Sequence, residues 1–201
     1  MSDKNKEVIS YISEHSNRII QNISIESINI YEYLCKEYCK SDISKNSIFQ
    51  FVFRSYYGLD NAGLSYEFKE TYFELLEESK TIQVDFKNIA ERLHKIKNIK
   101  QKDSLQISFT SKLVHTVQND FPIYDSKVAN LLGFSYIPAT IEVSKRIDGY
   151  LNQIESLKEL YNIIANEKMI IEKFNTRFET NISKEKKIDF ILWSAGKLKS
   201  K

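Results

Sequence analysis

Glycine and proline are scarce in this chain, with five glycines and two prolines among 201 residues. β-Sandwiches and β-barrels depend on such residues at their many turns, so the composition disfavours both fold classes. The sequence contains neither GxGxxG nor GxxxxGKS or GxxxxGKT, so it lacks the common glycine-rich signatures for binding nucleotide phosphates.

Cysteine and histidine are too few and too scattered to indicate a metal site. Cys35 and Cys39 lie one helical turn apart, a spacing that does not suit a disulfide framework and favours free thiols in a reducing compartment. The histidines are His15, His94 and His115, and no HExxH motif occurs. We therefore expect no metal site and no cofactor.

Long apolar runs and a strong net charge are also missing. No apolar stretch approaches the roughly 18 residues that span a bilayer, and no secretory leader opens the chain, so we expect a cytoplasmic protein without a membrane partner. The net charge of +2 is too small to indicate a polyanionic partner by itself. Hydrophobic residues make up 42% of the chain, which is enough for a substantial core.

Helical periodicity of apolar residues runs through most of the chain. Residues 46–57 are the exception, because their aromatic and β-branched content also suits a strand. Their helical neighbours and the absence of a pairing strand favour a buried helix. The predicted helices cover residues 3–20, 24–40, 46–57, 65–79, 85–98, 105–118, 126–132, 139–166, 167–178 and 183–198. The sequence therefore predicts an all-α, compact multi-helix bundle, with one domain over residues 1–201 and a subdivision near 58–64 as the alternative.

A basic run precedes the most informative part of the chain. It consists of Arg92, Lys95, Lys97, Lys100 and Lys102. Two interpretations stay open: a solvated helix face, or a patch that contacts nucleic-acid phosphates.

Lys112 lies on the predicted helix at residues 105–118, beside an apolar stripe. At about 100° per residue, Leu105, Phe109 and Leu113 share one face, and Lys112 falls at its edge next to Leu105. A lysine held against apolar surface has a lowered pKa, which frees the amine as a nucleophile. The alternative is a lysine whose stem covers the core while its ammonium reaches water.

Asp125 stands immediately before the predicted helix at residues 126–132, after Pro122 has ended the preceding helix. It is suited to cap that helix, and the helix dipole would keep its carboxylate ionised. An ionised carboxylate beside a nucleophilic amine is also the combination that displaces a base from a sugar carbon. The carboxylate can activate the nucleophile and stabilise positive charge on the sugar as the base departs.

These residues resemble a known family. A lysine on one helix, followed by a proline–aliphatic–aspartate turn that opens the next, is similar to the helix-hairpin-helix DNA glycosylases. The similarity is to the 8-oxoguanine DNA glycosylase (OGG)-like short bacterial proteins in particular. The matching motifs are FTSKLVH at 109–115 and FPIYDSKVANLLG at 121–133, and IDFILWSAGK at 188–197 resembles the last helix of the short proteins.

The resemblance implies a helix-hairpin-helix glycosylase fold and cleavage of an N-glycosidic bond. Lys112 would attack C1′ and form a Schiff base, Asp125 would assist, and the basic run would contact the DNA backbone. Short relatives occur in bacterial antiphage systems, which implies a modified base or nucleotide as substrate and a protein partner from a defence operon. The alternative is a non-catalytic helical module that binds nucleic acid or protein.

Overall fold

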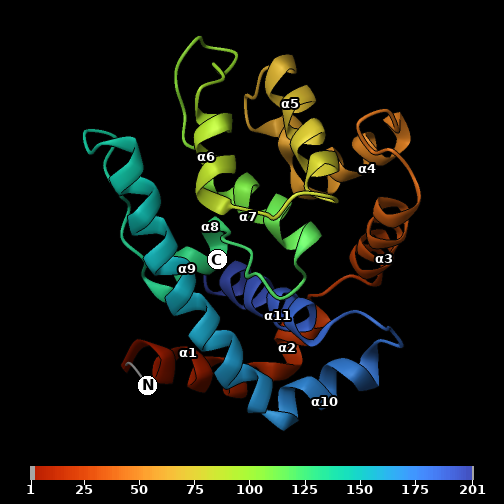
Figure 1. The fold of residues 1–201 in the computed structure, drawn as a ribbon. Helices are drawn as coiled ribbons and strands as arrows, with labels where there is room; N and C mark the ends of the chain where they lie inside the picture. Colours follow the sequence, from red (N-terminus) through yellow and green to blue (C-terminus); the bar gives the residue numbers. More distant parts are fainter. Residues whose placement is uncertain (1–2, 201) are drawn as a thin grey trace.

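The structure, a computed structural model, describes residues 3–200, and every regular element in that range is helical (Figure 1). The all-α fold class is thereby confirmed, and residues 46–57 do form a helix rather than a strand. The elements are α1 (Asp3–Glu14), α2 (Ser16–Gln21), α3 (Ile25–Lys40), α4 (Ser47–Tyr57), the 3-10 turn η1 (Leu59–Asn61), α5 (Tyr66–Glu78), α6 (Phe86–His94), α7 (Ile107–Val117), α8 (Ser126–Leu132), α9 (Val143–Asn166), α10 (Lys168–Arg177) and α11 (Lys184–Lys199).

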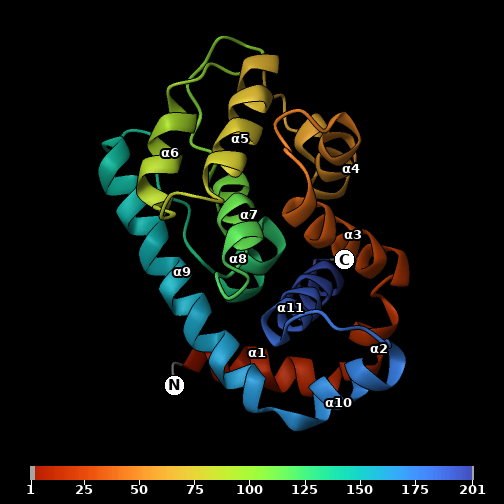
Figure 2. The ribbon, with the colours of Figure 1, turned by 45° about the vertical axis from the view of Figure 1, so that its right-hand side comes forward.

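Helix α11 lies at the centre of the lower half of the molecule, surrounded by α2, α8, α9 and α10 (Figures 1 and 2). Its residues from Ile188 to Gly196 are buried, apart from Trp193. A helix that is covered on nearly all sides has little surface for charged side chains. Lys186 and Asp189 are nevertheless buried on it.

The buried apolar residues form two clusters, and two helices contribute to both. One cluster lies among α1, α2, α8, α10 and α11, and the other lies among α4 to α7. On α9, Leu157 belongs to the first cluster and Ile154 to the second. On α3, Tyr31 belongs to the first cluster and Leu34 to the second. The turn at residues 58–64 lies within the second cluster, because Leu59 and Leu64 pack there together with α4 and α5.

The structure corrects three predicted helix boundaries. The first helix is divided at His15, whose ring stacks on Tyr11 at 4.4 Å between ring centroids. The helix predicted to reach residue 98 ends at His94, and beyond it the Asn98 side chain accepts hydrogen bonds from two backbone N–H groups of a turn. The helix predicted from residue 139 begins at Val143, because Pro138 opens a turn that Ile141 closes by donating to its carbonyl.

Two further features bear on the sequence-based expectations. Cys35 and Cys39 on α3 are both free thiols. Among the helices of residues 3–200, none combines the length and the apolar composition that crossing a membrane requires.

Candidate active site

Lys112 projects from the middle of α7 into an aromatic environment. Its side chain is 10% exposed, and its Nζ lies 4.9 Å from the centroid of the Phe109 ring and 5.6 Å from that of Tyr57. Nζ also donates a hydrogen bond to the backbone carbonyl of Tyr57 at 3.3 Å. The amine is therefore held mainly by ring faces and a single carbonyl, instead of reaching bulk water.

Asp125 uses its two carboxylate oxygens for different tasks. Oδ1 accepts a hydrogen bond of 2.8 Å from the backbone N–H of Lys127 and so caps α8, as the sequence predicts. Oδ2 lies 3.9 Å from Lys112 Nζ. Capping and pairing with the amine are thus compatible, because the cap fixes the carboxylate in the position from which it faces Lys112.

The segment that carries Asp125 is fastened to α7 by two buried side chains. The Ser111 hydroxyl accepts a hydrogen bond of 2.9 Å from Tyr124 N–H. His115 Nδ1 lies 2.7 Å from the carbonyl of Phe121, and its Nε2 lies 3.1 Å from the Tyr31 hydroxyl. Because a carbonyl only accepts, Nδ1 carries the proton and Nε2 accepts from Tyr31. Burial, helped by the positive charge of Lys186, lowers the pKa of His115 to about 4, so the ring is neutral at pH 7.

A pocket of about 300 Å³ opens between α3, α4, α7, α11 and the segment that precedes α8, and Lys112 and Asp125 both line it. We call it the Lys112 pocket. Its lining combines four aromatic side chains with four charged ones and two serines. The other lining residues are Ser27, Ser55, Tyr56, Tyr57, Gly58, Ile123, Lys186, Asp189, Phe190 and Trp193. Trp193 is 37% exposed, which makes it the large apolar side chain of this pocket that is most open to solvent.

Lys186 and Asp189 are pocket residues that the sequence analysis did not select. Lys186 Nζ lies 2.7 Å from Asp189 Oδ2, and both side chains are buried. A signal for them exists in the sequence. Residues 186, 189, 190 and 193 share one face of a helix, so two opposite charges stand there beside Phe190 and Trp193.

The environment of Lys112 changes the proton affinity of its amine. Burial is the largest cause and lowers the Lys112 pKa; Lys186 lowers it further, whereas Asp125 and Asp189 raise it. The net direction is downward from 10.5. A larger fraction of the amine is therefore unprotonated at neutral pH than in an exposed lysine, which is the state that attacks an electrophilic carbon.

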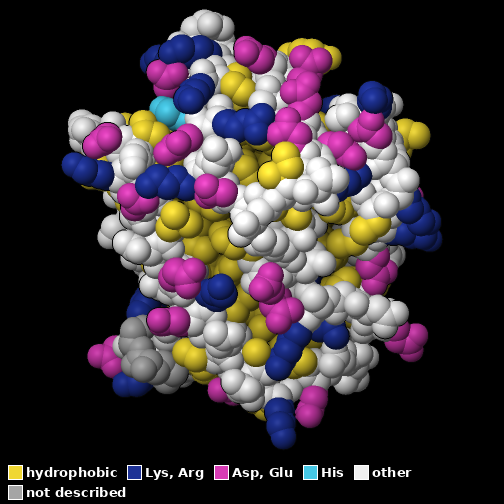
Figure 3. All heavy atoms as spheres, viewed as in Figure 1, with side chains coloured by type: hydrophobic (Ala, Val, Ile, Leu, Met, Phe, Trp, Pro, Cys, Tyr) yellow, Lys and Arg dark blue, Asp and Glu magenta, His cyan; other side chains and the backbone are white. Residues whose placement is uncertain are grey.

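The basic run lies away from this pocket. None of Arg92, Lys95, Lys97, Lys100 and Lys102 lines it. Two of them are paired: Arg92 with Glu78 at 2.8 Å and Lys97 with Asp103 at 2.7 Å. The segment between α6 and α7 extends to the top of the molecule in both ribbon views (Figures 1 and 2). Basic and acidic side chains are interspersed on the face in Figure 3. Phosphate contact by the run stays a prediction.

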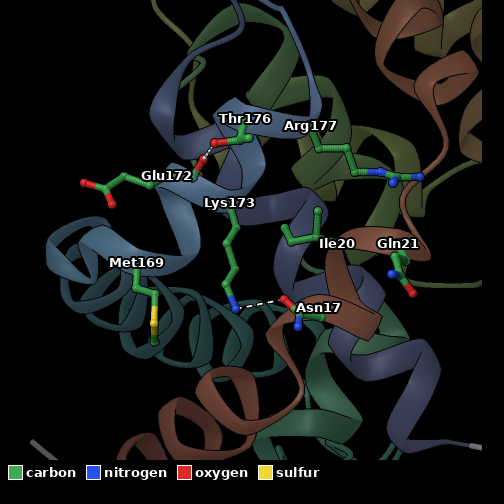
Figure 4. Close-up of a pocket in the computed structure, with 8 residues that line it drawn as sticks. All are labelled: Asn17, Ile20, Gln21, Met169, Glu172, Lys173, Thr176 and Arg177. Atoms are coloured by element: carbon green, nitrogen blue, oxygen red, sulfur yellow. Dashed lines mark hydrogen bonds between the residues drawn. The ribbon is translucent and has the colours of Figure 1, made fainter.

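A more voluminous hollow of about 600 Å³ lies between α2 and α10 (Figure 4). Lys173 projects into it and donates hydrogen bonds of 2.6 Å to Ser16 and 2.9 Å to Asn17. This lysine joins the two helices and forms no ion pair with a carboxylate within residues 3–200, so the hollow lacks the amine–carboxylate pair of the Lys112 pocket. Throughout residues 3–200, no three His, Cys, Asp or Glu side chains are grouped to hold a metal ion.

No protein-family model matches the chain, and no curated protein or solved structure does either. The resemblance to helix-hairpin-helix glycosylases therefore stays a prediction from the motifs at 109–115 and 121–133. What can be argued about function rests on the chemistry of the Lys112 pocket itself.

Proposed function

We propose that the chain is a DNA-glycosylase-like enzyme that cleaves the N-glycosidic bond of a damaged or modified base. In this proposal Lys112 is the nucleophile and Asp125 is the assisting carboxylate. One observation carries it: Lys112 Nζ and Asp125 Oδ2 are 3.9 Å apart and line the same pocket. Residues thirteen apart in the chain, on either side of a proline turn, thus line one pocket, which supports the proposal.

The reaction follows from the chemistry of an amine beside a carboxylate. The lone pair of neutral Lys112 Nζ forms a bond to C1′ of the sugar, and the bond from C1′ to the base breaks. The base leaves with the electron pair of that broken bond and takes up a proton from water. The Asp125 carboxylate stabilises the positive charge that develops on the sugar and accepts a proton from Nζ. The C1′–O4′ bond then opens: its electron pair leaves on O4′, which takes the proton held by Asp125, and the Nζ lone pair completes a protonated Schiff base between Nζ and C1′.

The size and walls of the Lys112 pocket suit a single extruded base. Enzymes that act on a base in a duplex must take it out of the stack and hold it against aromatic or apolar side chains. The volume of about 300 Å³ lies at the small end of ligand pockets and is lined by Tyr56, Phe190 and Trp193. The proposed substrates are DNA or a modified base or nucleotide.

Borohydride trapping tests the proposal. Duplexes that contain 8-oxoguanine, other damaged bases or an abasic site are incubated with the protein and sodium borohydride, and adducts are located by peptide mass spectrometry. We expect an adduct on Lys112 that Lys112→Met abolishes. Lys173→Met serves as the control, because Lys173 lies in the hollow between α2 and α10, and this variant should trap normally. Absence of an adduct with every duplex would remove the glycosylase mechanism and favour the non-catalytic interaction module.

For the cell, the proposal is that this activity serves antiphage defence and that the protein acts with a partner from a defence operon. It rests on the resemblance alone. We expect Lys112→Met to remove phage protection in a strain that depends on this protein, without raising the mutation rate. A raised mutation rate with unchanged protection would instead point to routine repair of damaged DNA.

A further inference from the structure

The Lys112 pocket contains two lysines and two aspartates, and they are unequally paired. Lys186 and Asp189 lie one turn apart on α11 with 2.7 Å between Nζ and Oδ2. Lys112 has its nearest carboxylate, that of Asp125, at 3.9 Å across two different segments. The α11 pair is therefore built into one helix, whereas the reacting pair depends on how α7 and the start of α8 are placed.

The surroundings of Lys186 hold it as a fixed cation. Its side chain is 2% exposed, and Nζ lies 4.5 Å from the centroid of the Tyr31 ring and 4.8 Å from that of Phe190. Ring faces attract a cation, and the carboxylate at hydrogen-bond distance holds the amine by a charge-assisted hydrogen bond. Lys186 is thus too enclosed to attack a sugar, and Lys112 is the lysine of the pocket that a substrate can reach.

Asp189 is also fully engaged. Its Oδ2 faces Lys186, and its Oδ1 accepts a hydrogen bond from the Tyr161 hydroxyl at 3.4 Å. If Lys186 did not bind it, Asp189 would be a second free carboxylate lining the pocket. Two free carboxylates near one amine would hold that amine as an ammonium ion, which is not nucleophilic.

We propose that Lys186 is a positioning residue that binds Asp189 and thereby leaves Lys112 with Asp125 as its single free carboxylate, so that the Lys112 amine remains available as a nucleophile. This inference rests on the proposed role of Lys112 as the nucleophile. In this role Lys186 acts through Asp189 and does not touch the substrate.

The charged and titratable groups that face Lys112 come from three directions. Asp125 faces it from the segment before α8, and Lys186 and Asp189 face it from α11. From α4 it meets the Tyr57 ring and carbonyl, and burial raises the pKa of the Tyr57 phenol, which is therefore neutral. Asp189 raises the Lys112 pKa and Lys186 lowers it, in agreement with the opposite roles given to them.

The test measures the protonation of Lys112 without any nucleic acid. Formaldehyde and sodium cyanoborohydride dimethylate unprotonated amines, so the rate of labelling at Lys112, followed by peptide mass spectrometry from pH 6 to 11, gives its titration midpoint. We expect Lys186→Met to shift this midpoint upward by about one pH unit, which is about a tenfold smaller neutral fraction at pH 7. Adding Asp189→Asn to Lys186→Met should reverse the shift, because the effect acts through Asp189.

Folding of each variant is checked by near-ultraviolet circular dichroism, because Lys186→Met leaves a buried carboxylate without its partner. If that variant does not fold, Lys186→Gln replaces it, since its amide can still donate to Asp189 without carrying charge. An unchanged Lys112 midpoint in the folded single variant would overturn the proposal. So would an upward shift that persists in the double variant. A protein that gives no adduct with DNA can still show the expected shifts, so failure of this inference and failure of the glycosylase mechanism are distinguishable.

Discussion

Gly196 on α11 lies so close to the backbone of Lys127 that a Cβ at residue 196 would be 2.4 Å from the Lys127 carbonyl oxygen. This contact joins α11 to the first turn of α8, two residues after Asp125. The close approach of the two helices is what allows α11 to bring Asp189 and Trp193 to the pocket that Asp125 lines. A glycine is required here for space, because the obstructing atom belongs to the backbone and cannot rotate away.

The first prediction follows from that contact. Gly196→Ala should destabilise the protein by about 1–3 kcal/mol, since the added methyl group forces α8 and α11 apart. Gly149→Ala is the matched control: its Cβ would be 2.6 Å from Ile137 Cδ1, the end of a flexible side chain that can change rotamer. Urea denaturation of both variants measures the difference. Equal loss of stability in the two would contradict the close-packing explanation.

Lys112 should cost the protein stability at neutral pH. Because the Lys112 pKa is lowered in the folded protein, the unfolded chain binds the additional proton between the two pKa values. The folded protein is therefore most stable above the unfolded pKa, and this stability is lost as pH falls through the folded pKa. Lys112→Met keeps an unbranched side chain of nearly the same length without the charge, and we expect it to raise the free energy of unfolding by about 0.5–2 kcal/mol at pH 7. The gain should shrink when the melts are repeated near pH 10. Lys97→Met, at an exposed ion pair, should give no gain at either pH.

Asp125→Ser should separate the capping task from the chemical one. Serine caps a helix about as well as aspartate, so we expect a loss of stability of less than about 1 kcal/mol. Loss of the carboxylate that faces Lys112 should lower the rate of borohydride trapping by about 10²- to 10⁴-fold. Asp85→Ser is the control, because Asp85 caps α6 through the same hydrogen bond, from Lys87 N–H at 2.9 Å, and does not line the pocket. Normal trapping by Asp125→Ser would exclude a chemical role for Asp125.

The neutral His115 predicts a loss of stability in acid. Its pKa is about 4 in the folded protein and 6.5 as the ordinary value, so between these pH values the unfolded chain binds the additional proton. The stabilisation is complete above pH 6.5 and is lost as pH falls through 4, which amounts to about 3 kcal/mol. The difference in unfolding free energy between the native protein and His115→Gln, measured from pH 7 to pH 4, isolates this contribution. A difference that does not change with pH would show that His115 has the same pKa in the folded and unfolded states, and would contradict the prediction.

The sequence was sufficient to predict most of the helices, because their apolar residues recur at helical spacing and their caps are local. Ser24, Asp85 and Asp125 accept hydrogen bonds from the first turns of α3, α6 and α8, as their positions indicate. Boundaries were wrong where a side chain competes for the backbone, as Asn98 does after α6.

The surroundings of Lys112 could not be predicted in the same way. Periodicity placed it at the edge of an apolar stripe, but whether its amine reaches water depends on Tyr57, which is 55 residues away in the chain. Lys186 and Asp189 were missed because an i, i+3 pair of opposite charge is ordinary on a solvated helix face. Their burial follows from the central place of α11, a property of the tertiary packing.

The central position of α11 has a consequence for the order in which the protein is made. Residues 184–199 leave the ribosome after every other described helix, yet they supply Lys186, Asp189 and Trp193 to the pocket. The preceding helices can form while synthesis continues, but the Lys112 pocket lacks the wall formed by α11 until that helix packs against them. A nascent chain therefore carries Lys112 in an incomplete pocket, and the chemistry proposed for it would begin only after translation has passed α11.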